Sequence, residues 1–79
     1  MNLEAIRRRV SGGGFQPFAL RTSDGREYAV RHPEMILVAP RSVAVVDRDG
    51  EIVTVDALHI VAVKNLRART NDASKRQAG

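Results

Sequence analysis

Two Asp-Gly turns constrain the fold of this chain more than any other feature. Asp24-Gly25 and Asp49-Gly50 each lie between short runs in which apolar and polar residues alternate, a pattern that predicts two antiparallel hairpins. At the first turn a two-residue loop would place Phe18 opposite Arg31, whereas a three-residue loop places Phe18 opposite Val30. We predict the three-residue loop because it gathers the apolar side chains on one face.

A three-residue loop, 48–50, also suits the second turn. It pairs Val45 with Val53 and Val43 with Val55, so that the valines of both runs share one face. The glycine that ends each loop is then expected in the left-handed conformation, next to a bulge.

The segments after the first hairpin and after the second also predict strands. The run Met35–Ala39 is apolar on both faces, which is typical of a strand covered on two sides. Pro40-Arg41 predicts the turn that follows it. The stretch "DALHIVAV" predicts a one-turn helix and then a last strand over His59–Val63. The expected total is five or six short strands within 15–63.

The N-terminal segment predicts a helix over 2–11. Asn2 can serve as its N-cap, and Leu3, Ile6 and Val10 recur along one face. "GGG" at 12–14 would end it. A helix of this length is not stable alone in water, so it must dock on the sheet or on another subunit.

The length of 79 residues allows one small domain. We assign the domain to 1–64 and expect 65–79 to be a disordered basic tail, because this stretch has one large apolar residue, Leu66, and no periodicity. The predicted fold class is mainly β (α+β), a short helix followed by antiparallel strands that form a small SH3- or Sm-like barrel. A two-layer roll with the helix on one face is the alternative.

Composition predicts a cytoplasmic protein without membrane contact. The chain has no cysteine, and therefore neither a disulfide framework nor a thiolate metal site. No apolar run approaches the roughly 20 residues that span a bilayer. The N-terminus, "MNLEAIRRRV", lacks the apolar core of a secretory signal.

The net charge of +4 is confined to the two ends of the chain. Residues 15–63 carry five arginines against seven acidic residues, so the predicted sheet is mildly acidic. Contact with RNA or DNA would therefore fall on the basic ends, where the candidate residues are Arg7, Arg8, Arg9, Lys64, Arg67 and Arg69. With only two Phe and one Tyr, a stacking platform for single-stranded bases is mostly missing.

The stretch "RHPE" offers the clearest candidate chemistry. His32 and Glu34 alternate along an extended chain and could act as a base with its orienting carboxylate, or as two metal ligands. No third ligand lies at useful spacing, and Pro33 favours an extended His32, so the stretch is predicted to be a corner between strands. His59, near Asp56, is expected to be a solvated residue at a strand end.

No other catalytic pattern is found in the sequence. "SGGGF" lacks the lysine and the strand-to-helix context of a phosphate-binding loop. We therefore predict no enzyme, no cofactor and no metal site. A small enzyme or regulator that uses His32, Glu34 and His59 stays a third alternative.

Apolar residues on both faces of two strands predict self-association. "MILVA" and "HIVAV" are apolar on both sides, and one short helix can cover only one of them. A second copy of the chain is the simplest cover for the other side, and we predict a homo-oligomer.

A longer motif is similar to a known group of proteins. The stretch "FQPFALRTSDGREYAVRHPEMI" follows the pattern PF-x-L-R-x-x-DGR-x-Y-x-V-x-HPE, and a D-x-x-HI pattern comes later. Over roughly 3–63 the chain thus resembles a family of short bacterial proteins with no assigned activity, which implies a compact bacterial domain. The matching residues are Pro17, Phe18, Leu20, Arg21, Asp24, Gly25, Arg26, Tyr28, Val30, His32, Pro33, Glu34, Asp56, His59 and Ile60.

The order of a helix followed by a bent sheet also resembles the Sm-like RNA-binding proteins. Their Lys-His or Arg-Gly pair before the last strand is replaced here by "ALHI", so the resemblance concerns architecture. We predict a non-enzymatic binding or adaptor module that self-associates. An RNA- or DNA-binding protein that uses the basic helix and tail is the alternative.

Overall fold

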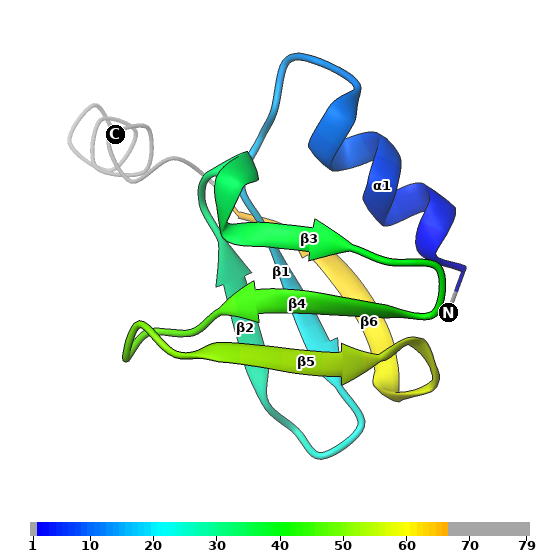
Figure 1. The fold of residues 1–79 in the computed structure, drawn as a ribbon, viewed down its shortest axis with the longest axis vertical. Helices are drawn as coiled ribbons and strands as arrows, with labels where there is room; N and C mark the ends of the chain where they lie inside the picture. The colour runs from blue at the N-terminus through cyan, green and yellow to red at the C-terminus, as the bar shows by residue number, and fades with distance from the viewer. Residues whose placement is uncertain (1, 67–79) are drawn as a thin grey trace, which may run out of the picture.

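A computed structural model describes residues 2–66 (Figure 1). It contains one α-helix, six strands and two short 3-10 turns, η1 and η2. In chain order these are α1 Leu3–Ser11, β1 Phe18–Thr22, β2 Glu27–Val30, η1 Pro33–Met35, β3 Ile36–Val38, β4 Ser42–Val46, β5 Ile52–Asp56, η2 Ala57–His59 and β6 Ile60–Asn65.

The strands form two antiparallel sheets of three strands each. The first has the order β2-β1-β6 and the second the order β3-β4-β5. In Figure 1 the second sheet lies in front of the first, their strands cross, and α1 lies beside β3. The mainly β class with one N-terminal helix is confirmed. Within residues 2–66 no closed barrel is found.

Both hairpins have the predicted register. Phe18 pairs with Val30, and the valines of β4 and β5 pair as expected. In the first hairpin the Thr22 N–H donates to the Arg26 carbonyl at 2.9 Å, which closes a three-residue loop. Gly25 and Gly50 have φ angles of 89° and 82°, the left-handed conformation that residues with a Cβ rarely adopt.

The N-terminal helix also agrees with its prediction. The Asn2 side chain accepts a hydrogen bond from the Glu4 N–H at 2.9 Å, and the Gly12 N–H donates to the Arg8 carbonyl at 2.9 Å. Leu3 and Ile6 are buried. The helix therefore docks on the body of its own chain.

Strands β3 and β6 differ from the prediction at both ends: β3 ends at Val38 instead of Ala39, and β6 begins at Ile60 instead of His59. Met35 lies in η1 because the turn that begins at Pro33 includes it, so β3 begins one residue later. β6 extends to Asn65, and the Leu66 N–H donates to the Pro17 carbonyl at 3.0 Å. Backbone pairing with Phe18 and Pro17 therefore orders Asn65 and Leu66, two residues that were assigned to the tail. The rest of that tail, 67–79, lies outside the described residues.

A small apolar core fills the space between α1 and the two sheets. Its largest fully buried side chain is Phe18, whose ring lies 5.9 Å from that of Phe15. The other members come from α1 and from all six strands; the cluster is Leu3, Ile6, Phe18, Leu20, Val30, Ile36, Val43, Val45, Val55 and Ile60. So few side chains leave little reserve of stability, as expected for a chain of this length.

Replacing Phe18 should therefore be the most damaging single truncation. We expect Phe18→Ala to lower the free energy of unfolding by about 3–5 kcal/mol in urea titrations, because it opens a cavity in a closed core. Phe18→Leu, a milder change, should lose roughly 1–1.5 kcal/mol. Phe15→Ala is the control: its ring is only half-buried, and an equal loss from this variant would contradict a core centred on Phe18.

Candidate functional site

The arginines of α1 do not form one basic surface. Arg7 pairs with Glu4 at 3.0 Å and its guanidinium also donates to the Ala39 carbonyl at 3.4 Å. Arg8 lies 3.8 Å from the same glutamate. Arg9 turns to another side of the helix, where it donates to the Asn65 side chain at 2.6 Å. One carboxylate thus offsets part of the charge of two arginines, and the third contacts the fold.

Arg9 and Lys64 both have partners within the fold. The Arg9 guanidinium lies 5.5 Å from the centre of the buried Phe18 ring, a cation–π contact that helps to attach α1 to the sheet. The Lys64 ammonium pairs with Glu27 at 3.0 Å across the outer face of the first sheet. Arg67 and Arg69, the other two candidates, lie outside the described residues. The predicted nucleic-acid residues are therefore dispersed as far as the structure describes them.

The candidate catalytic residues lie apart. His32 follows β2, whereas His59 lies beside the hairpin loop at the opposite end of that strand, with its ring 3.3 Å from the Ser23 hydroxyl. They border different hollows, of about 870 Å³ and about 320 Å³. His32 has φ −141° and ψ 145°, so the predicted extended corner before Pro33 is confirmed. Within residues 2–66 no three His, Cys, Asp or Glu residues cluster closely enough to hold a metal ion.

The carboxylate of Asp24 has a lowered pKa. Asp24 accepts hydrogen bonds from the Thr22 hydroxyl and from the Arg26 N–H, the latter at 3.1 Å. The first of these bonds, and then the second, lowers the pKa of Asp24 below its ordinary value of 3.8. A carboxyl whose pKa is lower folded than unfolded stabilises the fold above its ordinary pKa, and this contribution disappears as the pH falls through the folded value.

We therefore expect acidification below about pH 4 to weaken the fold partly through Asp24. The free energy of unfolding of Asp24→Asn should fall less between pH 5 and pH 2 than that of the wild type, in urea titrations at each pH. Thr22→Val, which removes the hydroxyl donor but keeps the carboxylate, should reduce the same pH dependence. If the free energy of unfolding of both variants fell with pH as steeply as that of the wild type, Asp24 would not be the source of the pH dependence.

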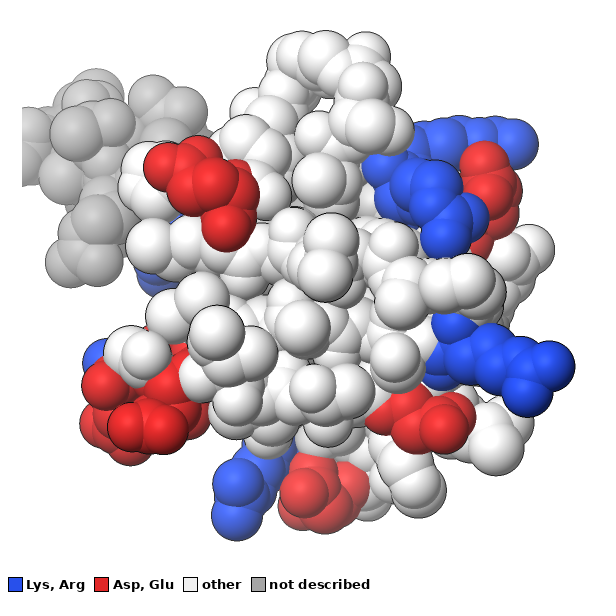
Figure 2. Space-filling model, viewed as in Figure 1, with Lys and Arg blue, Asp and Glu red and all other residues white. Residues whose placement is uncertain are grey.

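The outer face of the β3-β4-β5 sheet is the most unusual surface of the described molecule. Its central side chains carry no charge; they are Leu37, Ala44, Val46, Ile52 and Thr54, which we call the uncharged face. Leu37 and Ile52 are 69% and 74% exposed. In Figure 2 this face is the white centre of the surface, with charged side chains around it. Contiguous exposed apolar side chains of this kind mark interaction sites.

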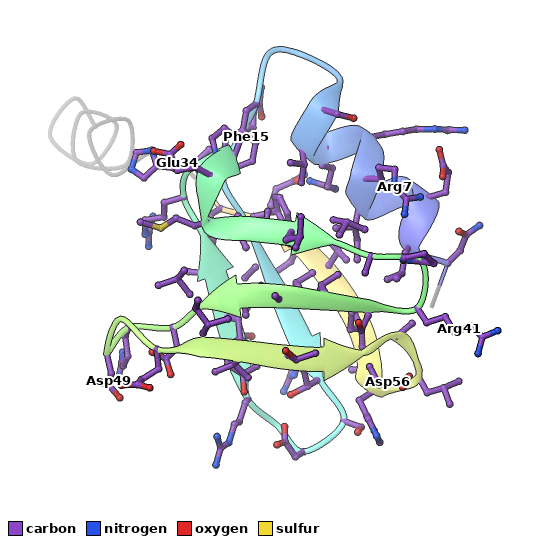
Figure 3. All side chains as sticks on the ribbon, viewed as in Figure 1. Arg7, Phe15, Glu34, Arg41, Asp49 and Asp56 are labelled. Atoms are coloured by element: carbon purple, nitrogen blue, oxygen red, sulfur yellow. The ribbon has the colours of Figure 1, made fainter. Side chains whose placement is uncertain are left out.

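Charges of opposite sign border the two ends of the uncharged face. Arg41 lies at the end formed by the β3–β4 turn, and Asp49 lies in the β4–β5 hairpin at the other end (Figure 3). The hairpin also carries Asp47, Glu51 and Arg48. Among the described residues, the ion pairs within 4 Å involve neither Arg41 nor Asp49. Both side chains are therefore available to a partner.

Comparisons with known proteins do not add to this picture: no family model matches the chain, and no similar curated protein or solved structure is found. Of the described residues, no helix is both long enough and apolar enough to cross a bilayer.

Only part of this surface could be predicted from the sequence. The run Met35–Ala39 was expected to be covered on two sides, but the described residues cover only one side of β3 and leave Leu37 exposed. The second hairpin contained a further signal. Once its inner valines are paired, Val46 and Ile52 must point to the outer face.

Proposed function

We propose that this chain is a non-enzymatic protein-interaction module that self-associates through the uncharged face. The observation that supports this function is the exposure of Leu37 and Ile52 on a sheet face whose charges lie only at its border. An apolar centre with a polar rim is the usual anatomy of a protein interface. Complete burial of a leucine or isoleucine side chain contributes about 1.5–3 kcal/mol.

The backbone of the same sheet supports this proposal. The Asp47 N–H donates to the Glu51 carbonyl at 2.8 Å, and hydrogen-bonded pairs alternate along an antiparallel ladder. The backbone groups of Ile52 and Thr54 therefore point away from β4, toward the edge of β5 that no other described strand pairs with. An edge strand with unpaired backbone groups beside an uncharged face favours contact with another protein over a purely solvated surface.

The proposal extends to fold type and cellular context. An SH3- or Sm-like arrangement is supported by the order of the helix and strands and by the sharp change of direction at η1, where the chain passes from β2 in one sheet to β3 in the other. Membership of the family of short bacterial proteins rests on the motif alone, and a cytoplasmic location rests on composition.

Self-association is tested by the mass of the full chain as a function of concentration. We expect the wild type to form an oligomer in sedimentation equilibrium, and Leu37→Asp to raise its dissociation constant at least tenfold, because the variant places an unpaired charge in the interface. Leu58→Asp is the matched control, since Leu58 is 83% exposed but lies in η2, outside the β3-β4-β5 sheet.

Two results would overturn this function. A monomeric wild type at all accessible concentrations would exclude self-association. If Leu58→Asp raised the dissociation constant more than Leu37→Asp did, the interface would lie outside the uncharged face. Both substitutions affect exposed side chains, so the fold should survive, and urea titration of each variant checks this.

Nucleic-acid binding is the second candidate function, and one observation favours it. The contact between Arg9 and Asn65 brings the C-terminal end of α1 to the end of β6, from which the chain continues toward Arg67 and Arg69. Arg9 and Lys64, one from each basic end of the sequence, thus lie on neighbouring elements of the fold.

This second function is tested with labelled single-stranded RNA and duplex DNA at roughly 50 to 300 mM salt. Micromolar binding that survives near 150 mM salt and weakens in a double Arg67→Ala, Arg69→Ala variant would support it. Binding that vanishes above about 100 mM salt would reject it. The double variant leaves the uncharged face unchanged, so its oligomer mass should equal that of the wild type.

A further inference from the structure

We propose that two copies of this chain pack uncharged face to uncharged face around a two-fold axis that runs across the strands, so that Arg41 of each copy meets the acidic β4–β5 hairpin of the other. This inference rests on the proposed self-association and adds the partner, the orientation and the residues that select it. It follows from the distribution of side chains along the sheet.

The uncharged face is displaced toward the hairpin end of its sheet. The registers place Val46 beside Ile52 in the row nearest the hairpin, and Leu37, Ala44 and Thr54 in the next outward row. The third row is polar, with Ser42 paired to Asp56. Because outward side chains are spaced by two residues, successive rows lie about 7 Å apart. The centre of the apolar area is therefore between the first two rows.

The two ends of the sheet carry opposite net charges. The hairpin and the nearby η1 turn carry four carboxylates against one arginine; they are Glu34, Asp47, Asp49 and Glu51 with Arg48. The opposite end carries Arg41 and the Arg7 and Arg8 side chains against Glu4 and Asp56. In Figure 2 the left border shows mainly acidic side chains, and the right border shows basic side chains together with some acidic ones.

These charges discriminate between the two symmetric ways in which identical faces can stack with their strands aligned. A two-fold axis along the strands would bring hairpin end against hairpin end, and the like charges would repel. A two-fold axis across the strands brings the acidic end of each copy against the basic end of the other. The second arrangement makes two equivalent pairs of opposite charges, as the isologous symmetry of a dimer requires.

The apolar area and the charged pairs fit the same arrangement. An axis between the first two rows places Val46 and Ile52 of one copy over Ala44 and Thr54 of the other. The β3–β4 turn lies about two rows from this axis, so the same rotation places it over the tip of the partner's hairpin. Arg41 then lies opposite Asp49 of the second copy, and neither side chain has an ion pair among the residues described.

Both side chains can be exchanged without altering the fold. The Arg41 carbonyl accepts the Ala57 N–H at 2.9 Å and the Asp49 N–H donates to the Asp47 carboxylate at 2.9 Å. These bonds use the backbone of Arg41 and of Asp49, so that a new side chain at either position keeps them. The two positions are therefore suited to a charge-reversal experiment.

The experiment measures the dimer dissociation constant of full-length variants by sedimentation equilibrium at about 50 mM salt, where charge effects are largest. Arg41→Glu and Asp49→Arg alone should each raise the constant about tenfold, because two attractive pairs become repulsive. The double variant Arg41→Glu, Asp49→Arg should return to within about threefold of the wild type. Arg21→Glu, the same change on the outer face of the other sheet, is the control and should have little effect.

Each outcome separates this inference from the function on which it rests. A monomeric wild type would overturn both. A dimer that is weakened by Leu37→Asp but not by either charge reversal, or not restored by the double variant, would overturn the orientation and leave self-association in place. A dimer insensitive to Leu37→Asp would indicate pairing through the β5 edge, which leaves the β3 side chains exposed, and would also overturn the face-to-face arrangement.

Discussion

Burial of Phe18 is the interaction on which the rest of this structure depends. Its ring is fully buried, contacts Phe15, and lies beneath the guanidinium of Arg9. One side chain from β1 thereby connects the helix, the linker before β1 and the interior between the two sheets. In a core of so few members, such a contact holds together elements that cannot be stable alone, since a nine-residue helix and isolated hairpins are all marginal in water.

Hairpin register is the second constraint, because it determines which side chains remain outside. A shift of one residue would exchange the inner and outer faces of a strand. With the three-residue loops in place, the valines at 43, 45, 53 and 55 point inward. Leu37 and Ile52 then stay exposed, and Val46 is only partly covered within residues 2–66. The uncharged face is thus a consequence of core formation. The hydrophobic effect that buries the inner valines also favours a partner that covers its exposed apolar area.

Local patterns predicted most of the secondary structure but less of the surface. The N-cap at Asn2, the left-handed Gly25 and the corner at His32 follow from short-range sterics and hydrogen bonding, which a few neighbouring residues determine. The end of β6 was harder to predict, because Asn65 and Leu66 are ordered by backbone bonds with a distant segment. The basic residues of α1 were grouped by sequence proximity, yet they diverge around the helix and contact different parts of the fold.

The sequence by itself determined the turns, the hairpin registers and the division of each strand into an inner and an outer row, because these depend on steric and hydrogen-bonding preferences over a few residues. Tertiary structure decided which outer row stays uncovered and how the charges at its ends are arranged. Helix α1 can pack on only one part of the molecule, and it lies beside β3 without covering Leu37. Arg41 and Asp49 lie at opposite ends of one face only once β3, β4 and β5 have paired. This pairing depends on long-range contacts that no local sequence pattern encodes.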